Sequence, residues 1–167
     1  MAAPNAPMRV IRVLEFYSGI GGMHFAIKGG VRLQHFSPND WFIKSYLDAT
    51  VIAAVDINDV ANKVYKYNFP HANLMQRNIQ SITVEEFDEM EADMFLMSPP
   101  CQPFTRVGLK GDLQDPRTQS FLHLLQTLPR LARMPSYILV ENVQGFEGSN
   151  SRAQLVKTLE NCCYDYQ

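Results

Sequence analysis

The sequence holds one cysteine between prolines, in the stretch Ser98-Pro-Pro-Cys101-Gln-Pro-Phe-Thr105. Because proline fixes φ at about −65° and cannot donate a backbone hydrogen bond, such a stretch is extended and rigid. Its thiol is therefore held in a defined direction. A thiolate is a strong nucleophile, and a positive neighbour such as Arg106 would favour it. The pattern predicts a nucleophilic Cys101, with inert packing of the thiol as the alternative.

A carboxylic acid, Glu141, follows the apolar run Tyr137-Ile-Leu-Val140. We expect a carboxyl at this place to be partly removed from water, which raises its pKa. A carboxyl that keeps its proton donates a hydrogen bond to a substrate. The alternative is an acid that caps a loop or a helix.

A glycine-rich turn, Ser18-Gly-Ile-Gly-Gly22, follows a first apolar run, and Asp56 closes a second one at 51–55. Glycine lets the backbone approach a ligand closely, and the free amides of the next helix point toward it. The spacing differs from the G-x-G-x-x-G of nicotinamide dinucleotide sites. An acid after the second strand can accept hydrogen bonds from ribose hydroxyls, although it can also serve the helix dipole. Together the two features favour a nucleoside site.

Asn78 and Ile79 follow a short third apolar segment at 73–76. An amide and an aliphatic side chain suit the edge and the face of an adenine ring. As a bare dipeptide they add only modestly to the predicted nucleoside site.

Short apolar runs alternate with amphipathic stretches along the chain, which predicts an α/β fold with a mostly parallel sheet. We expect strands at 10–16, 51–55, 73–76, 93–97 and 137–140, with the opening of a sixth at 163–167. Helices are expected at 23–28, after an N-cap at Asn58, after a capping box of Thr83 and Glu86, from about 118 and from about 151. The second of these helices carries its apolar side chains on one face: Val60, Ala61, Val64 and Tyr67.

The composition is that of an ordinary globular chain of about one domain, with 167 residues, 46% of them apolar, and a net charge of −2. It excludes collagen-like and disordered classes and lacks the strongly basic footprint of most nucleic-acid binders. We expect no membrane span, no secretory signal and no metal site. Three cysteines, two of them adjacent, predict a reduced compartment rather than a disulfide framework.

Four motifs follow one another along the chain in this order: Phe16-Tyr-Ser-Gly-Ile-Gly-Gly22, Asp56, the Pro-Pro-Cys stretch and Glu141-Asn-Val143. This set resembles the cytosine-5 methyltransferase family. The stretch Val60–His71 is most similar to eukaryotic members that modify transfer RNA. The resemblance covers about 8–28 and 51–167. It implies a Rossmann-like, S-adenosylmethionine-dependent methyltransferase fold that is incomplete at its C-terminal end.

The resemblance also implies a role for each motif residue. Cys101 would add to C6 of a cytosine, and Glu141 would hold N3 in protonated form. The turn residues Ile20, Gly21 and Gly22 would hold the methionine side of the cofactor S-adenosylmethionine, and Asp56 would hold its ribose. Asn78 and Ile79 would hold its adenine, and Ser98 would lie near its sulfonium. The target base would have to leave its stack, which costs less in an anticodon loop than in a duplex.

The chain departs from the family in two places. Members of the family continue past residue 167 with a target-recognition region, an arginine-bearing motif and a final cofactor-fold motif. We therefore expect a flexible stretch at 1–7 and, at 8–167, the N-terminal part of a catalytic domain without its target-recognition region. An atypical insertion is expected at about 29–50.

Three other functions fit the residues less well. The same chemistry on DNA is a close rival of the reaction on tRNA. A catalytically inactive form that binds cofactor or a partner protein is a second. A thiol redox protein is a third, but it needs a resolving cysteine near Cys101, and the pair Cys162-Cys163 lies far along the chain. We expect a cytoplasmic protein with access to the nucleus, and leave the oligomeric state open.

Overall fold

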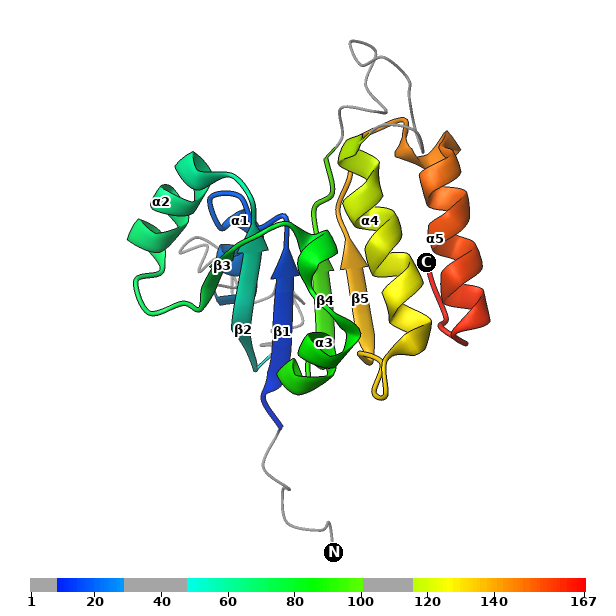
Figure 1. Ribbon diagram of the computed structural model, residues 1–167, viewed down its shortest axis with the longest axis horizontal. Helices are drawn as coiled ribbons and strands as arrows, with labels where there is room; N and C mark the ends of the chain where they lie inside the picture. The colour runs from blue at the N-terminus through cyan, green and yellow to red at the C-terminus, as the bar shows by residue number, and fades with distance from the viewer. Residues whose placement is uncertain (1–8, 29–47, 101–115) are drawn as a thin grey trace, which may run out of the picture.

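The computed structural model describes residues 9–28, 48–100 and 116–167, and within them five strands form one parallel sheet (Figure 1). The strands are β1 (Ile11–Phe16), β2 (Ala49–Asp56), β3 (Leu74–Gln76), β4 (Met94–Met97) and β5 (Tyr137–Val140), in the order β3-β2-β1-β4-β5. The predicted α/β class and all five predicted strands are confirmed. Since every strand pair is parallel, the carboxyl ends meet at one edge, the upper edge in Figure 1.

Strand β1 lies at the centre of the sheet. It pairs with β2 from Ile11 opposite Ala49 to Phe16 opposite Val55, and its last four residues also pair with β4. These last four residues, 13–16, are all buried. The residues that follow β1 at the carboxyl edge of the sheet therefore lie between the ends of β2 and β4.

Five α-helices accompany the strands in the described part of the chain: α1 (Gly22–Lys28), α2 (Asp59–Asn68), α3 (Val84–Met90), α4 (Pro116–Thr127) and α5 (Asn150–Asn161). Short 3-10 turns lie at Ile79–Ser81, Leu128–Arg130 and Phe146–Gly148. The predicted start signals are confirmed. The Asn58 side chain accepts the backbone N–H groups of Val60 and Ala61, and both bonds of the Thr83–Glu86 capping box are present.

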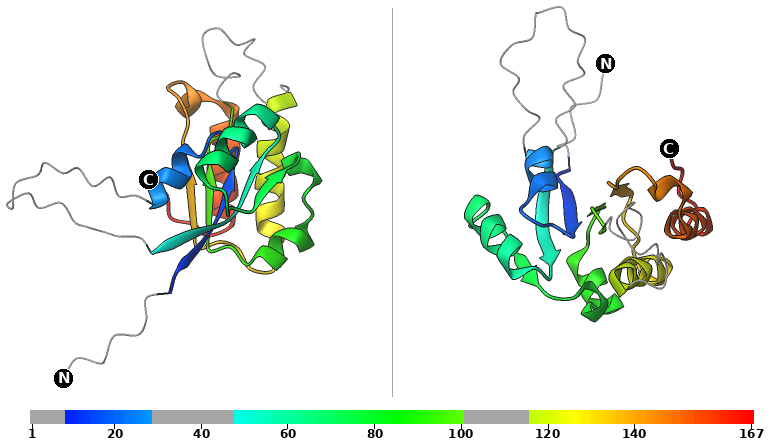
Figure 2. Two further views of the ribbon diagram at one scale, coloured as in Figure 1. Left: turned by 90° about the vertical axis from the view of Figure 1, so that its left-hand side faces the viewer. Right: turned by 90° about the horizontal axis from the view of Figure 1, so that it is seen from above.

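The two faces of the sheet are covered differently. Helix α1 lies on one face, and α3 and α4 lie on the other (Figure 2). Leu14 and Phe16 of β1 belong to the larger core, which includes Phe87 of α3 and Phe121 of α4. Successive side chains of a strand point to opposite faces. Glu15 therefore points to the α1 side, where a smaller core holds Tyr65.

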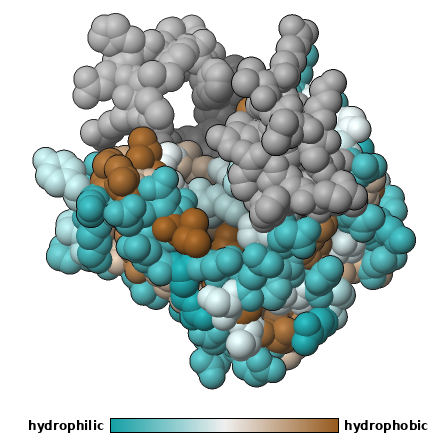
Figure 3. All heavy atoms as spheres, turned by 45° about the horizontal axis from the view of Figure 1, so that its top comes forward, coloured by the Kyte–Doolittle hydropathy of each residue, from teal (hydrophilic) through white to brown (hydrophobic). Residues whose placement is uncertain are grey.

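The apolar face predicted for α2 is not the buried one, so this expectation is wrong. Val60, Val64 and Tyr67 are 66%, 42% and 87% exposed, whereas Asn62 and Tyr65 are buried. The helix turns its polar side chains inward because the groups beneath it are polar: Asn62 donates to the Asp56 carbonyl and Tyr65 donates to the Glu15 carboxyl. Figure 3 shows exposed apolar side chains on the side of the molecule where α1 and α2 lie.

The sixth strand expected at 163–167 is not formed: among the described residues the sheet ends at β5, and residues 163–167 pair with none of its strands. Cys163 adopts a left-handed conformation with φ of 60°, and the Tyr164 amide donates to the Leu159 carbonyl at 2.9 Å. The Tyr164 hydroxyl then donates to the Pro135 carbonyl. These bonds turn the chain back from the end of α5 toward β5, where Tyr164, Asp165, Tyr166 and Gln167 line a hollow together with β5 residues without pairing to them.

Two expectations concern residues outside the described ranges. The flexible stretch at 1–7 lies there, and so does most of the insertion at about 29–50, of which Ala49 and Thr50 open β2. Among the described residues, no helix has both the length and the apolar character needed to cross a membrane.

Candidate active site

A pocket of about 460 Å³ lies at the carboxyl edge of the sheet, which is where parallel sheets bind ligands. Its size falls in the range of small-molecule sites, about 300–1,000 Å³. It is lined by residues at or just after the ends of β1, β2, β3 and β4, together with one from α4: Tyr17, Asp56, Ile57, Arg77, Asn78, Ile79, Gln80, Ser98, Pro100 and Ser120. Four of the seven cofactor residues expected from the sequence therefore lie around one cavity: Asp56, Asn78, Ile79 and Ser98.

Asp56 joins the glycine turn to the start of α2. Its Oδ2 accepts the Gly19 backbone N–H at 2.8 Å, and its Oδ1 accepts the Asn58 backbone N–H at 2.8 Å. An ionised carboxylate has about four acceptor positions, so two bonds leave room for more. This carboxylate is held by backbone groups on both sides while it lines the pocket, as a ribose-binding acid would require.

Asn78 and Ile79 form the wall that follows β3. The Asn78 Oδ1 accepts the Gln80 backbone N–H at 3.0 Å and caps the short 3-10 turn, while Ile79 is buried. The cap fixes the amide at the pocket margin, and the isoleucine gives the wall an apolar surface. On the neighbouring strand end, the Ser98 hydroxyl donates to the Met23 thioether and so connects β4 to α1.

The other three expected cofactor residues, Ile20, Gly21 and Gly22, do not line this pocket. Ile20 is 58% exposed. Gly21 has φ of +93°, and a Cβ there would overlap the Phe69 ring, so packing alone demands glycine at this position. A Cβ on Gly22 would meet nothing within 4 Å. The glycine turn is therefore shaped by α2 beneath it, and a role for these residues toward a ligand stays a prediction.

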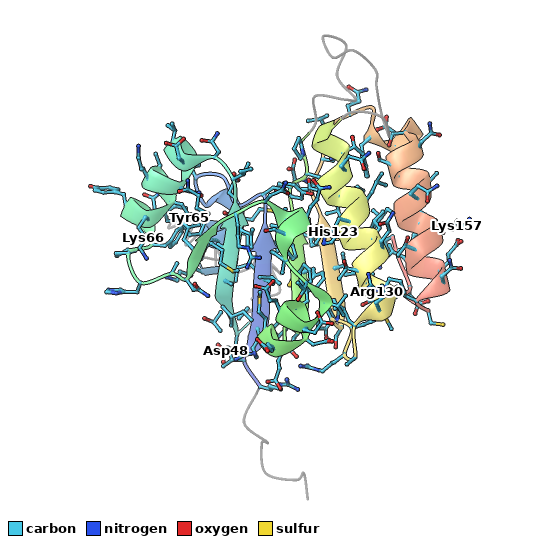
Figure 4. The ribbon with its side chains drawn as sticks, in the orientation of Figure 1. Asp48, Tyr65, Lys66, His123, Arg130 and Lys157 are labelled. Carbon is cyan, nitrogen blue, oxygen red and sulfur yellow. The ribbon has the colours of Figure 1, made fainter. Side chains whose placement is uncertain are left out.

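A buried hydrogen-bond network lies beneath the glycine turn and was not foreseen. The Tyr65 hydroxyl donates to Glu15 Oε2 at 2.8 Å and lies 2.6 Å from His24 Nδ1. Glu15, His24 and Tyr65 are each no more than 3% exposed, and the His24 ring stacks on Phe69 with centroids 3.8 Å apart. Figure 4 shows Tyr65 on the side of α2 that faces the sheet, with Lys66 farther out.

Burial controls how this network titrates. Desolvation raises the pKa of Glu15 from 4.5 to about 7, and the Asp56 charge adds to the rise, against the lowering effect of the Tyr65 hydrogen bond and of a backbone bond from His24. Desolvation, helped by the charge of Lys28, lowers the pKa of His24 to about 4. His24 is therefore neutral near pH 7, whereas Glu15 lies close to its midpoint.

Of the two predicted catalytic residues, Cys101 and Glu141, only Glu141 lies within the described residues. Cys101 lies outside the described residues, but Pro100, which precedes it, lines the pocket. Glu141 follows β5, and its backbone N–H donates to the Met97 carbonyl at 2.9 Å. The next side chain, Asn142, donates to the Pro99 carbonyl at 3.3 Å. The structure thus brings the Pro-Pro and Glu-Asn-Val segments together, whereas the expected partial burial of the Glu141 carboxyl is wrong, because this residue is exposed.

Several pocket residues were missed by sequence reasoning. Ile57, Arg77 and Gln80 flank the predicted residues, and this adjacency is the signal that could have found them. Tyr17 has the same signal and a left-handed φ of 55°. Burial raises the pKa of Tyr17, and its hydroxyl shares a hydrogen bond of 2.9 Å with the Ser120 hydroxyl. Nothing local in the sequence marks Ser120, since it comes to the pocket from α4.

A second hollow, of about 560 Å³, lies beside β5 and α5. It is lined mainly by apolar side chains such as Leu139, Leu155 and Val156, and it contains none of the residues predicted for chemistry. Across the described ranges, no group of three or more His, Cys, Asp or Glu side chains is placed to hold a metal ion. The pocket around Asp56 is therefore the candidate site.

Solved structures share this architecture. The crystal structure of the Schizosaccharomyces pombe Dnmt2 methyltransferase is 38% identical, with a TM-score of 0.72 over 92% of this chain and 41% of that one. The structure of the Entamoeba histolytica methyltransferase EhMeth is 32% identical, with a TM-score of 0.74 over 93% of this chain and 45% of that one.

Curated relatives agree with the structures. The Bos taurus tRNA (cytosine(38)-C(5))-methyltransferase is 55% identical over 160 residues, and the Homo sapiens protein of the same name is 54% identical; each match covers 96% of this chain and 37% of the relative. A Dictyostelium discoideum DNA (cytosine-5)-methyltransferase is 46% identical over 96% of this chain and 39% of its own length. The chain thus spans about two-fifths of the length of these relatives.

A family description, C-5 cytosine-specific DNA methylase, matches residues 11–167. The sheet order, the pocket at its carboxyl edge and the motif residues around that pocket belong to the matched range. This chain is therefore a member of the C-5 cytosine-specific DNA methylase family.

Proposed function

We propose that the protein transfers a methyl group from S-adenosylmethionine to C5 of a cytosine in tRNA, through a covalent bond between Cys101 and C6. The observation that carries the proposal is the shared cavity: Asp56, Asn78 and Ser98 line the same pocket as Pro100, the residue before the predicted nucleophile. A methyl donor and a nucleophile must meet in one site, and the position of Pro100 in this cavity supports such a meeting.

The pocket suits the cofactor in size and chemistry. It has a carboxylate with free acceptor positions for a ribose, an apolar wall at Ile79 and a volume of about 460 Å³. When bound, S-adenosylmethionine supplies an electrophilic methyl group on a positively charged sulfur.

The chain's own residues would then prepare the cytosine. C5 of cytosine is a poor nucleophile until the Cys101 thiolate forms a bond to C6, which places electron density on C5. Glu141 would hold a proton at N3 and stabilise the charge that develops there during attack. After methylation, the C5 proton leaves to a base, the C5–C6 double bond re-forms and the bond from C6 to the Cys101 sulfur breaks. Thiolate is regenerated for the next cycle.

The choice of tRNA follows the names of the most similar relatives, four of which, at 51–55% identity, are tRNA (cytosine(38)-C(5))-methyltransferases. A cytosine in an anticodon loop is also less costly to extrude than one in a duplex. DNA is the second candidate substrate, since the Dictyostelium relative is named as a DNA enzyme. The free thiols of Cys162 and Cys163 suit a reducing compartment, and we place the protein in the cytoplasm with access to the nucleus.

We further infer that residues 8–167 are the N-terminal, cofactor-binding part of a catalytic domain. The match to about two-fifths of each relative supports this inference. A role that stops at binding cofactor or a partner protein is the alternative.

Methyl transfer from radiolabelled S-adenosylmethionine to tRNA and to duplex DNA tests the proposal, alongside calorimetric binding of the cofactor. We expect label in tRNA, its loss in Cys101→Ala and its retention in Cys163→Ala, a matched control at the exposed free thiol after α5. Retained transfer by Cys101→Ala would exclude the covalent route. Cofactor binding without transfer to either substrate would favour the binding role.

A further inference from the structure

The pocket wall formed by residues 78–80 rests on short elements. It follows β3, a strand of three residues at one end of the described sheet, and it continues into the 3-10 turn Ile79–Ser81. Among the described strands, β3 pairs with β2 alone. All three residues of the wall line the pocket. A wall that holds a flat base in a fixed place therefore needs support from outside the strand and the turn.

Arg77, which also lines the pocket, supplies a tie across the turn. Its Nε donates to the Ser81 hydroxyl at 3.2 Å, and its Nη2 donates to the Ser81 carbonyl at 2.6 Å. The Ser81 hydroxyl in turn donates to the Asn78 carbonyl at 2.7 Å, and the Ser81 backbone N–H donates to the same carbonyl at 2.9 Å. The Arg77 side chain thus holds the far end of the turn, and Ser81 joins that end to Asn78.

The same guanidinium ties the turn to α3. Arg77 Nη1 donates to Glu86 Oε1 at 2.6 Å, and Nη2 donates to Glu86 Oε2 at 3.2 Å, which makes the ion pair bidentate. Glu86 is itself fixed, because its Oε2 accepts the Thr83 backbone N–H at 2.9 Å in the capping box. The next residue along α3, Phe87, belongs to the larger core. One planar side chain therefore connects the pocket wall to a helix that is anchored in the core.

The place of this ion pair matters more than its contribution to stability. The side chains of Arg77 and Glu86 are 31% and 36% exposed, and exposed ion pairs typically contribute little to folding. A guanidinium carries five N–H donors in a rigid plane, so it reaches Glu86 with two of them and Ser81 with others at the same time. A lysine ammonium is a single point of charge and has no such fork. The arrangement restricts geometry beside the pocket.

We propose that Arg77 and Glu86 are positioning residues that hold the wall formed by residues 78–80 against the base of the bound cofactor, and that they thereby give the pocket its preference for adenine. The inference rests on the proposed function, which places adenine against Asn78 and Ile79. Without the tie, the Asn78 amide and the Ile79 side chain are free to shift with the turn, and the contacts that distinguish one base from another weaken.

Calorimetric titration with two ligands that differ only in the base tests the inference. The ligands are S-adenosylhomocysteine and S-inosylhomocysteine, which carries hypoxanthine in place of adenine. Hypoxanthine has an acceptor where adenine has its amino donor, and a donor at N1 where adenine has an acceptor. A wall in a fixed place should therefore favour the adenine ligand by about tenfold or more in the wild type.

Arg77→Met should weaken binding of the adenine ligand by about three- to tenfold and bring the two affinities closer together. Arg133→Met is the matched control, because it also removes an arginine–carboxylate pair. Its partner Asp93 directly precedes β4, at the opposite edge of the sheet from the pocket, so both affinities should equal those of the wild type. A role in folding alone would weaken both ligands equally in Arg77→Met and leave their ratio unchanged, which would overturn the inference.

Two further variants test the geometry of the tie. Arg77→Lys keeps the charge but not the fork, so it should resemble Arg77→Met, and a restored preference would overturn the inference. Glu86→Gln should lower the preference for adenine in the same direction, because an amide offers one acceptor oxygen where the carboxylate offers two. An unchanged preference in Glu86→Gln would also overturn the inference.

Methyl transfer to tRNA and to DNA, measured beside the titrations, separates this inference from the proposed function. Transfer by a wild type that does not distinguish the two bases would overturn the inference and leave the proposed function standing. A preference for adenine that depends on Arg77, in a protein without transfer to either substrate, would support the inference and overturn the proposed transfer. Failure to bind S-adenosylhomocysteine at all would overturn both.

Discussion

Replacing Gly21 by alanine should destabilise the fold far more than the same change at Gly22. A Cβ at residue 21 would overlap Cε2 of Phe69 and approach Phe69 Cδ2 and Tyr65 Cδ2 to 3.1 and 3.2 Å. The Phe69 ring has little room to retreat, because His24 stacks on it with the ring planes 1° apart. Overpacking of this kind costs about 1–3 kcal/mol. Alanine at a φ of +93° adds about 1–2 kcal/mol of backbone strain.

Together the two costs lower the unfolding free energy of Gly21→Ala by about 2–5 kcal/mol. This is a large part of the total unfolding free energy of a typical domain, which is roughly 5–15 kcal/mol. Gly22→Ala is the matched control: its Cβ meets nothing within 4 Å, and alanine at the start of α1 should be neutral or stabilising by up to about 1 kcal/mol. Urea unfolding of both variants, followed by circular dichroism, measures the difference. Equal losses at both positions would refute the argument that Phe69 shapes the turn.

Three further outcomes are expected. Asp56→Ala should weaken cofactor binding by about 1–3 kcal/mol in calorimetry, since hydroxyls and the Gly19 and Asn58 amides lose their acceptor; an unchanged affinity would mean that the ribose is held elsewhere. Because the pKa of Glu15 is raised from 4.5 to about 7 in the folded protein, its contribution to the unfolding free energy falls as the pH rises from 4.5 to about 7. Because the pKa of His24 is lowered from 6.5 to about 4, its contribution falls as the pH falls from 6.5 to about 4. Between pH 4.5 and 6.5 the two contributions oppose each other, so the unfolding free energy of the wild type should stay nearly level. That of Glu15→Gln, which lacks the Glu15 contribution, should rise by about 2–3 kcal/mol over the same range. Parallel curves for the two proteins would count against these assignments. Thr83→Ala should cost about 1 kcal/mol of stability in urea unfolding through loss of the capping box, and a cost near zero would mean that solvent replaces the cap.

Much of the fold could be predicted because its signals are local. Apolar runs and cap residues such as Asn58 and Thr83 depend only on neighbours in the chain, and they gave the right order of strands and helices. The inward face of α2 could not be predicted in this way. Hydrophobic periodicity assumes an apolar partner, whereas Tyr65 and Asn62 turn inward to meet Glu15 and a backbone carbonyl.

Site residues could be predicted from the sequence where a polar side chain at the end of a strand suggests contact with a ligand. Asp56 ends β2 and Asn78 comes two residues after β3, and parallel strands bring such positions together at one edge. Contributions from other elements carry no such mark: Ser120 reaches the pocket from the middle of a helix, and the Glu15 network depends on three separate segments. Burial of Glu141 was overestimated because an apolar strand does not by itself cover the residue that follows it.

The central place of β1 has a consequence for synthesis on the ribosome. This strand emerges first, yet one of its two neighbours, β4, begins about 80 residues later. At roughly 5–20 residues per second, the β4 side of β1 stays unpaired for about 4–16 seconds. During that interval a strand whose last four residues are buried in the folded protein presents an unpaired edge, and unpaired strand edges are sites at which chains associate.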